Sequence, residues 1–248
     1  MKVSIILPNF NSSEFIKQTL KSIISQTYKN WELIIVDDNS DKSTKNILSK
    51  YKNKNKIKIF FLSKNKGAAY CRNLAIKKSR SDYIAFIDSD DLWKKNKLKK
   101  QIKFMKDNNL KFSFTSYEII DNNDNRIGLR EAQKSLSFKQ LRNSCDIGLS
   151  TVMIKKSIFN NEKFKFGTTK TKEDFILWLI LAKNGIEISG IKECLTSWRK
   201  NSTSLSSSNI QKIIDGYKVY RNYLYYSRLK SFFFLIILSL NFMLKKIR

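Results

Sequence analysis

Cysteine is scarce in this sequence, and the three that occur, Cys71, Cys145 and Cys194, lie far apart along the chain. An odd number of isolated cysteines supplies neither a disulfide framework within one chain nor a paired-cysteine metal site, which favours a reducing compartment. A long apolar run is also missing at the N-terminus. Residues 3–7 fall short of the roughly 7–15 apolar residues of a secretory signal, so we expect no export signal.

Acidic side chains are few as well. The sequence has 21 Asp and Glu against 48 Lys and Arg, a formal net charge of +27, which attracts phosphates and anionic lipid surfaces. The lysine-rich stretches 50–58 and 94–100 are interleaved with Asn and Ile, and the codon bias of an AT-rich genome explains them equally well. Hydrophobic residues still make up 42% of the 248 residues, which excludes a largely disordered chain. One large α/β domain with a tail fits this length.

The first third of the chain alternates between short apolar runs and helical spacing of apolar residues. The predicted strands are residues 3–7, 32–36, 57–62 and 83–87. Helical patterns lie between them, which indicates a mostly parallel sheet covered by helices. The turn after the first strand reads Pro8–Asn11 and has no GxGxxG, which excludes a dinucleotide-binding oxidoreductase.

The pattern changes in the middle of the chain. Residues 112–120 and 151–154 predict antiparallel strands, with a polar turn at 121–125. Residues 173–183 predict an apolar helix that ends at Gly185, because glycine is the usual residue at a helix C-terminus.

Two acidic clusters follow predicted parallel strands. Asp37 and Asp38 come after the second strand, and Asp88, Asp90 and Asp91 come after the fourth. Ligands bind beyond the carboxyl ends of such strands, so we expect the two clusters to meet at one edge of the sheet. Mg²⁺ and Mn²⁺ typically take one or two carboxylates and complete their shell with water and phosphate oxygens. Helix capping and turn formation are the alternative roles for these acids.

Several ordered blocks resemble the opening of glycosyltransferase family 2, whose members have the GT-A fold. They are residues 4–11 (SIILPNFN), 25–28 (SQTY), 32–40 (ELIIVDDNS), 65–73 (NKGAAYCRN) and 82–91 (DYIAFIDSDD). The resemblance covers roughly the first hundred residues and ends in the family's D-x-D element. It implies a Rossmann-like mixed, mostly parallel sheet flanked by helices.

The resemblance also implies roles for individual residues. Asp38 would accept a hydrogen bond from the base of the donor, commonly uracil, and Asp90 would bind a divalent metal, Mn or Mg. The other implied donor-binding residues are Pro8, Phe10, Arg72, Asp88 and Asp91.

Two later elements complete the expected site. Glu173-Asp174 resembles the family's E-D element, and Asp174 would be the catalytic base that takes the proton of the acceptor hydroxyl. We expect the helix N-terminus to hold the pKa of Asp174 down, although both acids could merely complement the helix dipole. Residues 197–206 resemble a basic, serine-containing loop that closes over the diphosphate, where Arg199 would clamp phosphate oxygens.

The predicted function is therefore an inverting glycosyltransferase that moves one sugar from a nucleotide diphosphate-sugar, expected to be a UDP-sugar. The acceptor would be a hydroxyl of a cell-surface glycan or of a lipid-linked molecule. Addition of a single sugar is expected because the Q-x-x-R-W element of processive relatives does not occur. A nucleotidyltransferase of related fold would release pyrophosphate instead. A non-enzymatic nucleic-acid-binding protein would use the positive charge, but the acidic edge would repel a polyanion. We expect no nucleic acid partner, and the sequence leaves the oligomeric state open.

The predicted domain organisation is a GT-A domain at residues 1–209 and a helical tail at 210–248. The nucleotide-sugar-binding half would be 1–120 and the acceptor half 121–209. Residues 232–244 are mostly apolar and end in basic residues, but a bilayer span needs roughly 17–25 residues. A helix lying on anionic lipid at the inner face of the cell membrane fits this pattern, with the protein otherwise cytoplasmic. Packing on the domain core or on a partner chain is the alternative.

Overall fold

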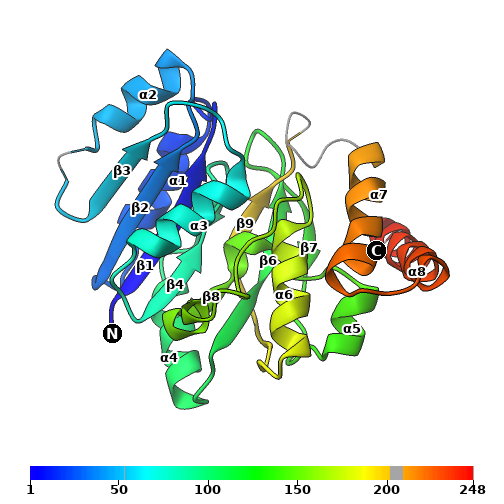
Figure 1. Ribbon diagram of the computed structural model, residues 1–248. Coiled ribbons are helices and arrows are strands. Elements are labelled where there is room, and N and C mark those ends of the chain that lie inside the picture. Colours follow the sequence, from blue (N-terminus) through cyan, green and yellow to red (C-terminus); the bar gives the residue numbers. More distant parts are fainter. Residues whose placement is uncertain (53, 202–208, 248) are drawn as a thin grey trace.

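The computed structural model describes residues 1–52, 54–201 and 209–247, which form a mixed β-sheet with helices on both faces (Figure 1). The strands are β1 (Val3–Asn9), β2 (Trp31–Asp37), β3 (Ile57–Phe61), β4 (Tyr83–Phe86), β5 (Leu92–Trp93), β6 (Phe112–Ile120), β7 (Arg126–Arg130), β8 (Met153–Lys155) and β9 (Ser189–Arg199). Their order across the sheet is β3-β2-β1-β4-β8-β6-β9-β5, and β7 pairs with β6.

The four predicted strands of the first third are confirmed. β1 pairs in parallel with β2 and with β4, and β2 pairs in parallel with β3. The runs are continuously apolar because both faces of these strands are covered by helices. The carboxyl ends of β2 and β4 therefore lie at the same edge of the sheet, separated only by β1.

The second half of the sheet differs from the prediction in detail. β8 is antiparallel to β4 and β6, as expected, but it begins at Met153, because Leu149–Thr151 forms a 3-10 turn. β9 was not predicted from the sequence, and it runs parallel to β6 and antiparallel to β5.

Helices cover both faces of the sheet. They are α1 (Ile16–Ile24), α2 (Lys42–Ser49), α3 (Ala68–Lys78), α4 (Lys97–Asp107), α5 (Phe138–Asn143), α6 (Glu173–Lys183), α7 (Asn209–Lys218) and α8 (Arg228–Ile247). Alternate side chains of a strand point to opposite faces, and Ile5 and Ile6 of β1 accordingly lie in two different cores. One core contains residues of α1, α2 and α4, and the other contains residues of α3, α6 and the C-terminal helices.

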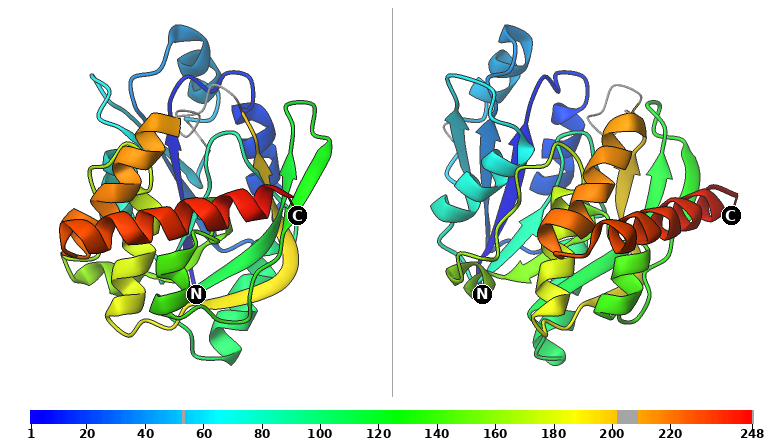
Figure 2. Two further views of the ribbon diagram at one scale, coloured as in Figure 1. Left: turned by 90° about the vertical axis from the view of Figure 1, so that its right-hand side faces the viewer. Right: turned by 45° about the vertical axis from the view of Figure 1, so that its right-hand side comes forward.

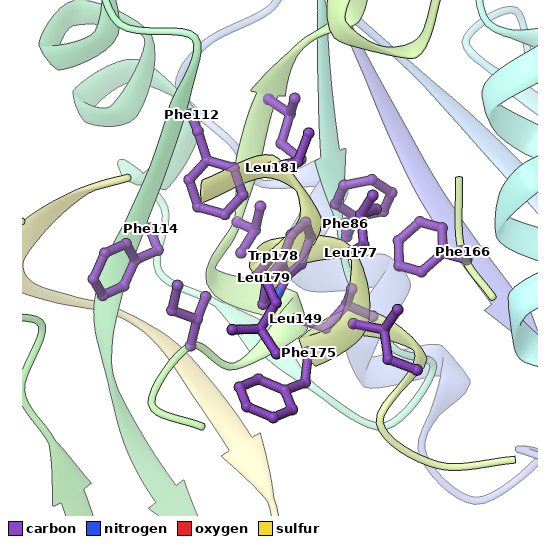
Figure 3. Close-up of a cluster of buried hydrophobic side chains, with 14 of the residues drawn as sticks. Phe86, Phe112, Phe114, Leu149, Phe166, Phe175, Leu177, Trp178, Leu179 and Leu181 are labelled. Carbon is purple, nitrogen blue, oxygen red and sulfur yellow. The ribbon is translucent and has the colours of Figure 1, made fainter. Parts of the chain in front are cut away.

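Trp178 of α6 lies in the middle of the second core (Figure 3). Its ring is 5.0 Å from that of Phe112 and 6.2 Å from that of Phe166, with edge-to-face geometry in both pairs. The predicted helix is confirmed, and it ends at Asn184 and Gly185, where Gly185 has a φ of +78°. Burial on nearly all sides explains its apolar sequence and fixes the helix whose first turn carries Glu173 and Asp174.

The C-terminal segment packs on the domain and also exposes apolar side chains. Tyr220, Phe234 and Leu238 belong to the same core as Trp178, so the packing alternative holds for one face of α8. Figure 2 shows α8 running across the outside of the second half of the molecule. Among the described residues, no helix has the length and apolar character that a membrane crossing requires. The domain boundary at residue 209 stays a prediction.

Candidate active site

The acidic loop after β4 is held by hydrogen bonds from distant parts of the chain. Asp91 is 1% exposed and accepts hydrogen bonds from the Arg199 N–H (2.9 Å) and from the Ser150 hydroxyl. The Asp88 N–H donates to the same Ser150 hydroxyl at 3.0 Å. Burial, followed by the charges of Asp90 and Asp88, raises the pKa of Asp91 well above its usual value. Asp91 thus fixes the loop from within rather than presenting a carboxylate to solvent.

Asp88 and Asp90 form the more accessible part of this loop. The Asp88 side chain is 34% exposed, and only one of its oxygens is used in its ion pair with Arg72. Burial and the neighbouring Asp88 charge raise the pKa of Asp90 to about 6. A bound cation would relieve this repulsion between the two carboxylates, so the donor set fits a divalent metal.

Protein side chains alone do not build a complete metal shell here. Within residues 1–52, 54–201 and 209–247, no three His, Cys, Asp or Glu side chains are grouped so that they could hold a metal. One or two carboxylates completed by a diphosphate and water would match both this finding and the preference of Mg²⁺.

Arg72 of α3 connects the acidic loop to α6. Its Nη2 lies 2.8 Å from Asp88 Oδ1, and its Nη1 lies 2.6 Å from Glu173 Oε1. Burial opposes the charge of this guanidinium, but Asp88 and Glu173 together raise its pKa above the usual value. Arg72 was expected beside the nucleotide, and it also forms this bridge between the D-x-D loop and the E-D helix.

Asp174 lies next to Glu173 in the first turn of α6, where its Oδ1 accepts a hydrogen bond from the Phe175 N–H at 2.7 Å. Its pKa is raised to about 6, because burial and the Glu173 charge outweigh the attraction of Arg72. The expectation that the helix N-terminus holds this pKa down was wrong, because desolvation is the larger effect here. The pKa of this carboxylate is therefore close to neutral pH, which suits a general base.

Asp37 and Asp38 follow β2, but they do different things. Asp37 is buried and accepts hydrogen bonds from Asn9 (2.7 Å) and from the backbone and side chain of Ser40, as the turn-forming alternative predicts. Both oxygens of Asp38 accept backbone hydrogen bonds, from the N–H groups of Lys66 (2.7 Å) and Gly67 (2.8 Å). Asp38 therefore ties the β2 loop to the start of α3, where Gly67 has a φ of +87°.

The two residues predicted from β1 lie at the same edge of the sheet. Pro8 is buried within β1 opposite Val36, whereas Phe10, just beyond the strand, is 48% exposed. An exposed aromatic ring beside the carboxyl ends of parallel strands can stack on a nucleotide base.

Arg199 at the end of β9 is 1% exposed and does not reach solvent. Its three guanidinium nitrogens donate to the backbone oxygens of Asp90 (3.0 Å) and Asp121 (2.8 Å) and to the side chains of Gln18 and Asp124. This arrangement leaves the guanidinium enclosed by protein and differs from the expected phosphate clamp. Residues 202–206 of the predicted basic loop lie outside the described residues.

The structure thus joins most of the predicted residues in one network. Asp88, Asp90 and Asp91 are connected to Asp174 through Arg72 and Glu173, and Asp38 and Phe10 follow the neighbouring strands. Ser150 was not predicted as a partner of the acidic loop, because no pattern in the sequence marks it. The adjacency of Glu173 to Asp174 was the available signal for Glu173.

A cavity of about 560 Å³ lies at the other end of the strands. Its walls include Lys2, Trp31 and Lys58, which lie at or beside the amino ends of β1, β2 and β3, and none of the predicted site residues lines it. It is therefore separate from the acidic edge.

Comparisons with known proteins identify the family of this chain and its fold. A family model described as glycosyl transferase family 2 matches residues 4–167. TuaG from Bacillus subtilis (strain 168), whose name assigns it provisionally to teichuronic acid biosynthesis as a glycosyltransferase, is 36% identical over 221 residues, which are 88% of this chain and 87% of TuaG. WfgD from Escherichia coli, a UDP-Glc:alpha-D-GlcNAc-diphosphoundecaprenol beta-1,3-glucosyltransferase, is 36% identical over 85% of this chain and 82% of WfgD.

A solved structure shares the fold. The crystal structure of residues 1–349 of TarS from S. aureus, in complex with UDP-GlcNAc, matches with a TM-score of 0.75 and 22% identity, over 95% of this chain and 70% of that chain. The predicted GT-A architecture with a C-terminal helical segment is confirmed by this likeness.

Proposed function

The chain belongs to glycosyl transferase family 2, and on this basis we propose that it moves a single sugar from a UDP-sugar to a hydroxyl group of a lipid-linked or polysaccharide acceptor, with inversion. The observation that carries the proposal is the ion-paired bridge Asp88–Arg72–Glu173, because it fixes the acidic loop against the helix that bears Asp174. The bound UDP-sugar and the base Asp174 would then be held at a fixed distance and orientation relative to each other.

The donor would bind along the carboxyl ends of β1, β2 and β4. Phe10 offers an aromatic face to the base, and Asp38 shapes the loop at Lys66 and Gly67 beside it. Asp88 and Asp90 would hold the diphosphate through Mn²⁺ or Mg²⁺, with Asp90 as metal ligand. When bound, the cation neutralises the negative charge that develops on the departing diphosphate.

Asp174 would act as the catalytic base. Its oxygen that is not bonded to the Phe175 N–H takes the proton of the acceptor hydroxyl. The acceptor oxygen then forms a bond to the anomeric carbon while the bond from that carbon to the phosphate oxygen breaks, and UDP leaves. A pKa of about 6 keeps Asp174 ionised at neutral pH and still basic enough to accept the proton.

The proposed acceptor places the protein next to a membrane. WfgD acts on a diphosphoundecaprenol-linked sugar, and an acceptor of that kind is held in the lipid. On α8, Leu229, Phe233, Ile236, Leu240 and Met243 are exposed and follow one another at intervals of three or four residues, so they form one apolar stripe. From Gly216 to the end of the sequence there is no Asp or Glu. An anionic lipid surface at the inner face of the cell membrane complements both properties.

Binding of UDP tests the donor site directly. Calorimetric titration of UDP in Mn²⁺ and in EDTA should show affinity at least about tenfold higher with the metal, because the diphosphate completes the metal shell. Asp90→Asn should lose this gain.

Asp107→Asn is the matched control, since Asp107 is an exposed carboxylate at the end of α4 that pairs with Lys103. It should keep the metal effect. Equal UDP affinity in Mn²⁺ and EDTA for the unchanged protein would contradict the metal-assisted site, and no UDP binding in either would contradict the proposed function.

A further inference from the structure

The start of α6 is held in an unusual way for a helix that carries a catalytic base. The residue before it, Lys172, is in the left-handed conformation with a φ of 68°, and its own side chain makes no capping hydrogen bond to the first turn. Helices usually rely on a capping side chain to satisfy and fix their first N–H groups. The position of Asp174 therefore depends on other contacts.

Two such contacts come from α3 and fix one side of the approach to α6. Arg72 pairs with Glu173 at 2.6 Å, and Asn73 exchanges two hydrogen bonds with the backbone of Phe166, at 2.9 and 3.0 Å. These contacts from α3 do not involve the residues immediately before Lys172, which are held by a different element.

Asp215 of α7 provides that hold. Its side chain is fully buried, and its Oδ2 accepts hydrogen bonds from the Thr171 N–H at 3.0 Å and from the Thr171 hydroxyl at 3.1 Å. Gln211 donates to the same oxygen at 2.9 Å, and Lys218 lies 3.3 Å from Oδ1. Burial opposes the charge of Asp215, but these hydrogen bonds together lower its pKa below the usual value. The charged acceptor makes both bonds to Thr171 stronger than neutral ones.

We propose that Asp215 is a positioning residue for the transfer reaction, which sets the place of Asp174 by fixing Thr171 three residues before it. The inference rests on the proposed role of Asp174 as base. It gives the C-terminal segment a part in catalysis, because Asp215 of α7 bonds to Thr171, which lies just before α6.

Asp215→Asn tests this, because it keeps the size of the side chain and removes its charge. We expect kcat to fall at least tenfold, since a displacement of about 1 Å can cost about 10²-fold in rate. The KM for the UDP-sugar and the affinity for UDP should change less than about twofold, because the residues proposed to bind the UDP-sugar lie on other loops. Thr171→Val removes one of the two donors, and its effect on kcat should be non-additive with that of Asp215→Asn.

Asn241→Ala is the matched control. It removes a hydrogen bond from α8 to the Asn143 carbonyl oxygen (2.8 Å) and loosens the same helical segment without touching Thr171. With a water-soluble acceptor, its kcat should match that of the unchanged protein. An equal loss of kcat in Asn241→Ala, or an unchanged kcat in Asp215→Asn, would overturn the positioning role. The variant Asp174→Asn distinguishes a failure of the positioning role from a failure of the proposed function. If Asp174→Asn still transfers the sugar, Asp174 is not the catalytic base.

Discussion

At the scale of single residues, Asp174 combines a helix N-terminus with a carboxyl that resists ionisation. The folded protein raises its pKa to about 6, whereas an unfolded Asp has a pKa of about 3.9. Folding therefore favours the protonated form. The protonated Asp174 carboxyl contributes its full stabilisation below pH 4, and this contribution is lost as the pH rises through 6. At neutral pH the buried negative charge of Asp174 therefore destabilises the folded protein.

Replacing Asp174 should separate stability from activity. Asp174→Asn keeps the shape and removes the buried charge, so we expect the free energy of unfolding at pH 7.5 to rise by about 1–3 kcal/mol while transfer is lost. Thermal unfolding at pH 7.5 and at pH 4 measures it, and the gain should shrink at the lower pH. An equal or lower Tm at pH 7.5 would contradict the raised pKa.

The same group predicts a pH dependence of the rate. A base must be ionised to accept a proton, so kcat should fall about tenfold per pH unit below the pKa of Asp174, near 6. The rate should be measured between pH 4.5 and 8 with saturating metal, donor and acceptor, so that donor binding does not limit it. A kcat that stays constant down to pH 5 would assign the base to another group.

Some of these residue roles were predictable and others were not. The order of apolar run and acidic turn placed Asp88 and Asp90 at the edge of the sheet from local sequence alone. The residues next to Arg199 in the sequence suggest a solvent-exposed basic side chain. Its guanidinium is instead buried, because it bonds to the turn at Asp121–Asp124 and to Gln18 of α1. Contacts between residues so far apart in the sequence leave no local pattern.

At the scale of elements, α8 shows two apolar faces with different roles. Phe234 is 7% exposed and lies 5.7 Å from the ring of Tyr220 and 4.1 Å from the Arg142 guanidinium. The adjacent Phe233 is 58% exposed. One helix turn therefore contains both a core residue and a surface residue of the same type, so the sequence alone could not separate packing from surface contact.

This pair predicts opposite outcomes. Phe234→Ala should lower the free energy of unfolding by about 3 kcal/mol, because it leaves a cavity in the second core. Phe233→Ser should change it by less than about 0.5 kcal/mol, as surface substitutions usually do. Urea unfolding of the two variants measures both values. A similar loss in both would mean that the exposed face is buried in solution.

Continuity of apolar residues also decided which strands could be predicted. β1, β2 and β4 are buried on both faces, and their uninterrupted runs marked them. β9 reads SGIKECLTSWR, and its buried and exposed positions alternate irregularly, because its pairing with β6 is interrupted by register shifts. An irregular strand of this kind has no period for a sequence to reveal.

At the scale of the whole molecule, the charge of +27 and the stripe on α8 act together. Basic residues attract the protein to an anionic surface over about 10 Å at 0.1 M salt, whereas apolar side chains act only on contact. Binding by charge attraction alone would be lost at high salt. Binding by insertion of apolar side chains alone would be equally strong on anionic and on neutral lipid. The combination predicts binding that requires both anionic lipid and the exposed stripe.

Vesicle sedimentation can test this combination. The protein should sediment with phosphatidylglycerol vesicles at low salt, less so at about 1 M salt, where the screening length falls to about 3 Å, and weakly with phosphatidylcholine alone. The double variant Phe233→Ser/Leu240→Ser should lose most of the binding, since these two side chains of the stripe are 58% and 55% exposed and each contributes apolar area to insertion. Ile127→Ser on β7, at 53% exposure, is the matched control and should bind normally. Undiminished sedimentation of the double variant would leave charge as the sole cause of attraction, and the stripe on α8 would then have no part in membrane contact.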